Sequence, residues 1–301
     1  MLNLAPVKYA NCYETVGGPI RLIEESSIRI GGLMHSVANA SLDGPFRMKK
    51  GSGVVYASVD GTGIDIDPIQ ARYKAISEAI EGWAFGVAHL SDAKEKYGFL
   101  MDHTSNGMAA FPGLFPQQTR SFALREAVER FSLVAWWNEE TGIKELGQDS
   151  KGLEVFEILQ PFRKHKVVLL RRIKENDYNV FSYGCGSDLD SAKQSALFEL
   201  ERSDILLESF YGRNSGFEWE DLSTIESFVE RRLIAFSLPE GLELFEEKVE
   251  KTKDLNTIAK PKVLVDRQIP GPWSKYAFVW RVLLDMPSDD YLNPEELTFY
   301  F

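Results

Sequence analysis

Two short segments of this chain repeat the same arrangement of glutamates and apolar residues. Glu78-Ala79-Ile80-Glu81 and Glu126-Ala127-Val128-Glu129 each lie within an apolar pattern of helical period that continues into tryptophan. At about 100° per residue, the apolar side chains of each segment form one stripe, and the two glutamates project together from the opposite face. Carboxylates three residues apart on a helix are neighbours. Two such helices placed face to face would gather four anionic groups, which only cations could stabilise.

The ordinary interpretation of either pair is the solvated face of an amphipathic helix. The same faces, however, carry Phe85 in the first segment and Phe122, Leu133 and Trp136 in the second. A helix that is apolar on both sides is a buried helix, and buried carboxylates must be paired or bind a metal. Oxygen ligands without His or Cys neighbours are typical of a Mg²⁺ site completed by phosphate oxygens.

The sequence around these segments resembles that of a known family. Ser105-Asn106-Gly107-Met108-Ala109-Ala110, followed by Ala123 to Arg130, resembles the central signature of the YcaO family. Three further segments extend the resemblance over residues 50 to 210, and they are Asp60 to Gly63, Ala75 to Glu81 and Ala192 to Glu199. YcaO proteins are ATP-dependent enzymes that activate a peptide backbone amide by phosphorylating its oxygen. The resemblance therefore implies this activity, with ATP and Mg²⁺ as cofactors.

Carried over position by position, the resemblance implies roles for individual residues. The ligands of the Mg²⁺ ions that bridge the nucleotide phosphates would be Glu78, Glu81, Glu126 and Glu129. Arg130 matches the family arginine that supports the phosphates, a catalytic role suited to a bidentate, permanently charged guanidinium. Its ordinary interpretation is an intrahelical partner of Glu126. The remaining nucleotide-contacting positions would be Lys74, Gln118, Glu199 and Arg202.

Several nucleotide positions depart from the family pattern. The changed residues are Lys74 and Ala109 for serine or a serine-like residue, Gly82 for arginine, Gln118 for glutamate and Arg202 for glutamine. Lys74 lies about one turn before Glu78, so it could neutralise a carboxylate, touch phosphate or replace a Mg²⁺ ion. The sequence thus permits an active enzyme with altered ATP contacts. It equally permits a catalytically weakened YcaO-like subunit that binds a partner or peptide without efficient ATP turnover.

The resemblance also implies a substrate and partners. The expected substrate is a ribosomally synthesised precursor peptide, and the expected product an azoline, a thioamide or an amidine. Azoline-forming relatives end in Pro-x-Pro-x-Pro, whereas this chain ends in Asn293 to Phe301, which lowers the expectation of an azoline. The chain lacks the length for an attached leader-binding domain, so we expect a separate leader-binding partner protein. A homodimer is the expected assembly.

Composition places the chain among globular proteins. With 301 residues, of which 44% are hydrophobic, it can form one large YcaO-like domain or two intimate subdomains, with a candidate boundary at 138–152. No signal peptide or apolar run of about 18 residues occurs, so we expect a cytoplasmic protein that does not associate with a membrane. Only Cys12 and Cys185 are present, too few for a disulfide framework. A net charge of −11 without a Lys/Arg stripe argues against nucleic-acid binding.

The expected fold is an α+β sandwich of mixed β-sheets and long helices, in two pseudo-repeated halves. Short β-branched or alternating runs predict strands at 19–24, 28–37, 53–59, 97–102, 166–173, 180–184, 262–267 and 275–285. Helical periodicity predicts helices at 68–90, 118–138, 221–236 and 239–254, and Ser187 to Asp190 predicts the cap of another long helix.

Gly61-Thr62-Gly63 allows two interpretations. Its amides could approach a phosphate, or the glycines could simply form a turn. Walker-type and Rossmann spacings are absent from the sequence, which excludes those phosphate loops.

Overall fold

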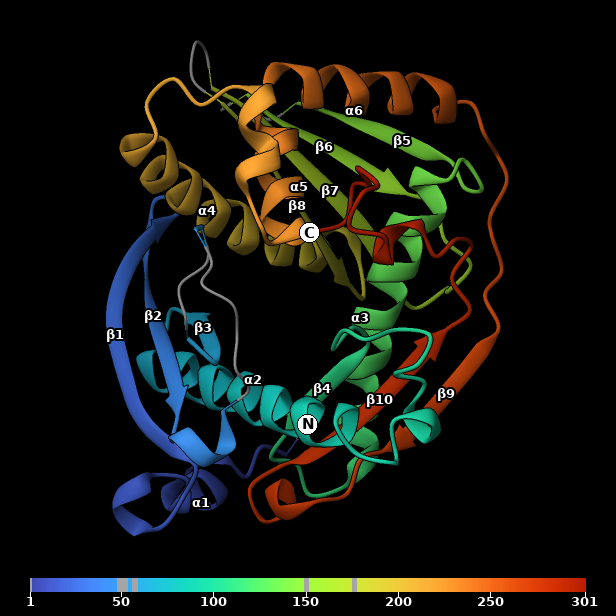
Figure 1. Ribbon diagram of the computed structural model, residues 1–301. Helices are drawn as coiled ribbons and strands as arrows, with labels where there is room; N and C mark the ends of the chain where they lie inside the picture. Colours follow the sequence, from blue (N-terminus) through green and yellow to red (C-terminus); the bar gives the residue numbers. More distant parts are fainter. Residues whose placement is uncertain (1, 48–53, 56–58, 149–151, 175–177) are drawn as a thin grey trace. The chain divides into compact units, whose positions relative to one another are not determined.

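The structure is a computed structural model, and it describes residues 2–47, 54–55, 59–148, 152–174 and 178–301 (Figure 1). The chain forms two compact units. Unit 1 comprises residues 1–50, 58–127 and 263–284, and unit 2 comprises residues 51–57, 128–262 and 285–301. The passage from 127 to 128 falls within helix α3 (Pro116–Trp137). The stretch 138–152, predicted as a boundary, lies inside unit 2, and its residues 149–151 are outside the described part.

A three-stranded antiparallel sheet supports one side of unit 1. Its order is β1 (Ile20–Ile30), β2 (Leu33–Leu42) and β3 (Gly61–Asp65). Two strands were predicted in this region, at 19–24 and 28–37, but their bounds differ from those observed. The break between β1 and β2 lies at Gly31 and Gly32, both of which have positive φ. Helix α2 (Pro68–His89) packs on β2 and β3 (Figure 1). Its first turn is capped by the Asp67 carboxylate, which accepts a hydrogen bond from Ile69 N at 2.9 Å.

Close packing of α2 on β3 explains the two glycines of the Gly61-Thr62-Gly63 stretch. A Cβ on Gly61 would lie 2.3 Å from Ala75 O, and one on Gly63 would lie 2.1 Å from Ala71 O. Alanines on the facing side of the helix allow the same approach. The stretch is therefore a strand under a helix, and the prediction of a turn is wrong.

A second antiparallel sheet in unit 1 has the order β4 (Met108–Phe111), β10 (Phe278–Leu284) and β9 (Val263–Gln268). The strand predicted at 97–102 is wrong, because Gly98 turns the backbone with a φ of +72° while its apolar neighbours stay buried. The core of the unit lies around Trp83 of α2, whose ring meets that of Trp273 edge-on at 5.5 Å.

Unit 2 has a four-stranded antiparallel sheet in the order β5 (Ile143–Gln148), β6 (Leu153–Ile158), β7 (Lys166–Ile173) and β8 (Asn179–Gly186). Helix α4 (Leu189–Arg213) packs on β8 and β7 (Figure 1). As predicted, α4 has a polar cap, because Asp188 and Ser191 each accept a hydrogen bond from the backbone of the other. The remaining helices are α5 (Phe228–Ser237) and α6 (Pro239–Thr252).

The two units share one local arrangement. On β8, a Cβ on Gly184 would lie 2.4 Å from Ala196 N of α4, just as β3 is pressed against α2. Each unit thus pairs a Gly-x-Gly strand with an Ala-x₃-Ala helix, which gives the predicted pseudo-repeat a physical basis. The α+β prediction is confirmed, with sheets that are antiparallel rather than mixed.

Some short elements differ from prediction or were not predicted. The helix predicted at 221–236 is divided into a 3₁₀ turn and α5, because Ser227 caps α5 separately. The strand predicted at 53–59 lies largely outside the described residues. The short α1 and the described 3₁₀ turns are Ala5–Lys8, Tyr9–Asn11, Glu14–Val16, Gly44–Phe46, Glu95–Tyr97, Trp219–Thr224, Pro272–Lys275 and Asp290–Leu292.

Candidate functional site

Helix α2 and the first part of α3 bring three of the predicted carboxylates together in unit 1. Glu78 is exposed and accepts a hydrogen bond from Thr62 N of β3 at 2.8 Å. Glu81, one turn further on, is only partly exposed. Burial raises the pKa of Glu81 well above its usual range, and the negative charges of Glu126 and Glu78 raise it further. The charges of Glu78 on α2 and Glu126 on α3 therefore both act on Glu81.

Two neighbours act in the opposite direction on Glu81. The Ala110 amide donates to its carboxylate, and the charge of Arg281 attracts it, so both lower the pKa. The net effect still disfavours the ionised form. An approaching cation would reverse this balance, because a bound metal ion is the largest local charge in a site.

The donor set fits a hard divalent cation, since it consists of carboxylate oxygens. Within the described part of the chain, no three His, Cys, Asp or Glu side chains are grouped closely enough to hold a metal ion together. The carboxylates therefore interact by charge without sharing one coordination point. Glu129 follows Glu126 by three residues on α3 and belongs to unit 2.

Arg130 also lies in unit 2, beside Glu129. Its Nε is 3.9 Å from Glu129 Oε1, and its Nη1 donates a hydrogen bond to the Tyr183 hydroxyl on β8. Burial raises the pKa of Tyr183, the charge of Arg130 lowers it, and the charge of Glu129 raises it again. The contacts of Arg130 therefore include a tyrosine that the sequence analysis did not single out.

The signature turn around Asn106 is held by a buried arginine. Arg281 of β10 donates from Nη1 to Asn106 O, and its Nη2 is 3.1 Å from Asp102 Oδ2. Both members of this ion pair are fully buried. Gly107 has a φ of +65°, and its carbonyl accepts from Val282 N at 2.7 Å. A lone arginine in the apolar run of β10 is the sequence signal that could have identified this residue.

Lys74 and Gln118 make contacts on the body of unit 1. Lys74 Nζ lies 2.8 Å from Asp65 Oδ2 and donates to Ile64 O at 2.8 Å. Gln118 accepts hydrogen bonds through Oε1 from the amides of Leu114, at 2.8 Å, and Phe115. Both changed positions therefore contribute to local structure at the edge of β3 and at the start of α3.

Glu199 and Arg202 lie together on α4 in unit 2. Arg202 Nη1 is 3.6 Å from Glu199 Oε2, an i,i+3 pair on one helix face. Half of the Glu199 side chain is exposed, so this pair is accessible from solvent.

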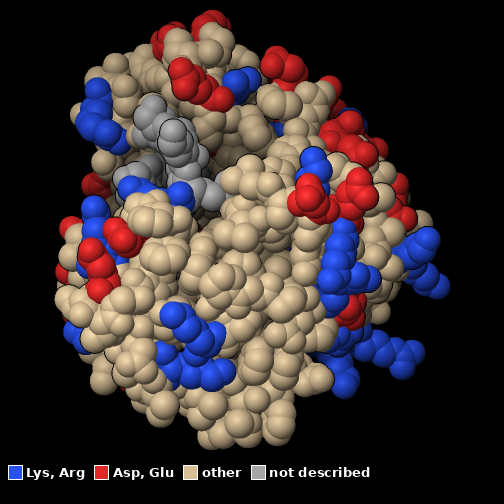
Figure 2. All heavy atoms as spheres, turned by 60° about the horizontal axis from the view of Figure 1, so that its bottom comes forward, with Lys and Arg blue, Asp and Glu red and all other residues tan. Residues whose placement is uncertain are grey.

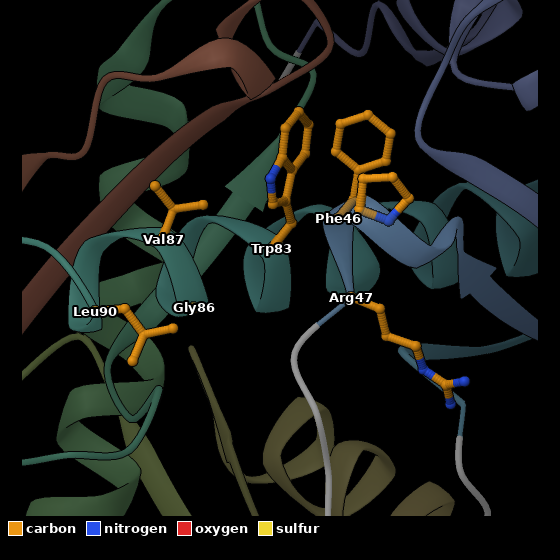
Figure 3. A pocket seen from close by; sticks show the side chains of 7 residues that line it. Phe46, Arg47, Trp83, Gly86, Val87 and Leu90 are labelled. Atoms are coloured by element: carbon orange, nitrogen blue, oxygen red, sulfur yellow. The ribbon is translucent and has the colours of Figure 1, made fainter.

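A separate hollow lies on another face of α2. It has a volume of about 440 Å³ and is lined by Pro45, Phe46, Arg47, Trp83, Gly86, Val87 and Leu90 (Figure 3). Phe46 and Trp83 meet edge-on at 4.8 Å on its wall. None of the predicted site residues lines it.

The surface is mixed in charge. On the face drawn in Figure 2, acidic and basic side chains stand in small groups between wide uncharged areas, and the coloured residues form no continuous basic stripe. In the part of the chain that the structure describes, no helix combines the length and apolar character needed to cross a membrane.

No family model matches the sequence, and no curated protein matches it. Solved structures of similar fold include the following two. One is the structure of YcaO from Methanopyrus kandleri bound with AMPPCP and Mg²⁺, with a TM-score of 0.54, 16% identity, and coverage of 92% of this chain and 87% of the other. The second is the E. coli microcin synthetase McbBCD complex with pro-MccB17 bound, with a TM-score of 0.53, 14% identity, and coverage of 88% and 87%. The chain therefore has the YcaO fold, as its motifs predicted.

Proposed function

We propose that this chain binds ATP with Mg²⁺ and activates a peptide backbone amide by phosphorylating its oxygen. The observation that carries the proposal is the placement of Glu78, Glu81 and Glu126 in unit 1, three carboxylates at predicted metal positions whose charges act on one another. Such a group requires a proton or a cation, and the carboxylate set favours a hard cation. One protein of the same fold is bound with AMPPCP and Mg²⁺, which supports this choice of ligand.

In this proposal, Glu78, Glu81, Glu126 and Glu129 hold the Mg²⁺ ions, which neutralise the phosphate charges when bound. Arg130 binds the phosphate oxygens through its N–H groups and stabilises the charge that develops during transfer. The amide oxygen forms a bond to the γ-phosphorus while the bond to the β-phosphate oxygen breaks, and ADP leaves. A Cys, Ser or Thr side chain of the peptide, an external sulfide or an amine then attacks the activated amide carbon, and the amide oxygen leaves as phosphate with loss of a proton from the nucleophile. The product is an azoline, a thioamide or an amidine, respectively.

The proposed substrate is a ribosomally synthesised precursor peptide, presented by a separate leader-binding protein. A complex of the same fold has pro-MccB17 bound, which supports a peptide substrate and partner proteins. We propose that the chain acts as a homodimer in the cytoplasm. Turnover should require the peptide, because transfer needs the amide in line with the γ-phosphate.

Two contacts favour a second candidate function, that of a catalytically weakened subunit. Lys74 pairs with Asp65, and Gln118 holds the turn before α3. Residues at predicted nucleotide-binding positions that instead make structural contacts are expected in a subunit that binds a partner or peptide without efficient ATP turnover. Arg202, another changed position, is paired with Glu199 on α4.

Calorimetry with Mg²⁺ and a non-hydrolysable ATP analogue tests metal and nucleotide binding. Glu81→Gln should abolish most of the affinity of the parent chain, and Glu95→Gln, at an exposed glutamate outside the cluster, should leave it unchanged. Without Mg²⁺, Glu81→Gln should raise the melting temperature, because it removes a charge that the fold disfavours. Equal affinity in the Glu81 variant and the parent would refute the metal site.

The reaction is tested by phosphate release and by mass spectrometry of the peptide. The chain alone should release phosphate slowly, and a candidate peptide with its partner protein should increase the rate and change the peptide mass by loss of water or gain of sulfur. Rapid hydrolysis by the chain alone would contradict the mechanism. Nucleotide binding without modification of any cognate peptide would favour the weakened subunit.

A further inference from the structure

The Tyr183 hydroxyl lies between Arg130 and the main chain of residue 301. Arg130 Nη1 donates to the Tyr183 oxygen, and the Tyr183 hydroxyl in turn donates to Phe301 O. All three residues belong to unit 2. One side chain on β8 therefore joins the guanidinium to a main-chain acceptor.

Two aromatic rings complete this arrangement. Arg130 Cζ lies 5.0 Å from the ring centroid of Tyr183 and 5.4 Å from that of Tyr300. Both distances are within the range of cation–π attraction. Only about a fifth of the Arg130 side chain is exposed. The guanidinium is thus restrained by a hydrogen bond at its edge and by rings near its carbon.

The acceptor for Tyr183 is itself fixed. Phe299 is fully buried, and its ring lies 4.8 Å from that of Phe236 and 5.5 Å from that of Trp136. The Phe301 ring lies 5.1 Å from that of Phe299 and 5.9 Å from that of Phe236, so residue 301 is held by its own ring contacts. The Phe301 carbonyl can therefore hold the Tyr183 hydroxyl in one orientation, and Tyr183 can transmit that restraint to Arg130.

We propose that Tyr183 is a positioning residue for Arg130, which it holds in one orientation toward the phosphate oxygens. This inference rests on the proposed function, in which Arg130 contacts those oxygens. An ordered guanidinium binds a phosphate with less loss of side-chain entropy than a mobile one. Tyr183 itself does not contact the nucleotide in this arrangement.

A double-mutant cycle separates positioning from general stability. Tyr183→Phe keeps the ring and removes the hydroxyl, and it should weaken binding of Mg²⁺ with a non-hydrolysable ATP analogue about tenfold. In an Arg130→Lys background, the same change should cause little further loss, since the residue it positions is gone. Tyr178→Phe is the matched control, because its hydroxyl bonds Asp204 in the same unit; it should leave affinity unchanged. Losses that add fully in the double variant would overturn the inference.

A second readout does not depend on the nucleotide. The Nε–H cross-peak of Arg130 in the ¹H–¹⁵N spectrum is assigned as the one that is missing from the spectrum of Arg130→Lys. Tyr183→Phe should shift or broaden that cross-peak, whereas Tyr178→Phe should not. An unchanged cross-peak in Tyr183→Phe refutes the inference even where the parent binds nucleotide. If Tyr183→Phe shifts the Arg130 cross-peak but the parent chain binds no nucleotide, the proposed function is refuted. The positioning contact between Tyr183 and Arg130 is then still established.

Discussion

Replacing the buried Arg232 should loosen the end of the chain. Arg232 is 1% exposed and donates to several carbonyls of the final segment. The three shortest bonds are to Tyr291 O at 2.7 Å, Asn293 O at 2.8 Å and Glu296 O at 2.9 Å. Hydrogen bonds from a charged donor stabilise by about 2 kcal/mol each. Burial lowers the pKa of Arg232 from its usual value to about 10, so keeping it charged costs about 3 kcal/mol. Arg232→Met removes both contributions, with a net loss of about 3 kcal/mol.

The assay is thermal unfolding of Arg232→Met, followed by circular dichroism and tryptophan fluorescence. A loss of about 3 kcal/mol corresponds to a fall of about 5 °C in melting temperature for a chain of this length. The fluorescence should shift to the red, because the same segment carries Phe299 against Trp136. Arg231→Met is the control: its donors reach carbonyls only at 3.2 and 3.4 Å, so the cost should stay below about 1 kcal/mol. Equal melting of the two variants would refute this reasoning.

Two further changes test unit 1 by thermal melting. Gly61→Ala should destabilise the protein by about 2 kcal/mol or more, because its Cβ would lie 2.3 Å from a backbone oxygen of α2. The control is Gly212→Ala on α4, where the added Cβ would meet open space, so this change should be neutral or stabilising. Similar losses of stability at both glycines would contradict the packing argument. Asp102→Asn should cost about 3 to 5 kcal/mol, because it leaves the fully buried Arg281 without its counter-charge. Asp266→Asn, which weakens a partly exposed ion pair, should cost about 1 kcal/mol or less, and a reversed order would show that the buried pair is not needed for the fold.

Local sequence was a good guide wherever an element is defined by its own residues. The helix predicted at 68–90 is α2, and Asp188 caps α4 as expected. The strands β4, β5 and β6 were not predicted. β4 has only four residues, which are too few to show a period, and β5 and β6 mix apolar and charged residues. Strand propensity depends on neighbouring strands, which a single sequence does not identify.

The candidate site divides in the same way. The spacing of Glu78 and Glu81 on α2 follows from helical geometry, so the sequence determined which carboxylates share a face. It did not identify Arg281 as the partner of Asp102, since 179 residues separate the two. The sequence also left open whether Lys74 joins the acidic cluster. In the structure, the Lys74 ammonium pairs with the Asp65 carboxylate and donates to a main-chain oxygen of β3.

The amino-acid sequence by itself determined the long helices α2, α3 and α4, the cap of α4 and the acidic spacing, because these depend on residues within one or two turns. The tertiary structure decided which distant groups meet. Tyr183 reaches Arg130 across 53 residues and Phe301 across 118. Arg281 meets the signature turn only because β10 pairs with β4. Periodicity carries no information about such pairs, since it records which face a side chain occupies and not which chain segment packs against that face.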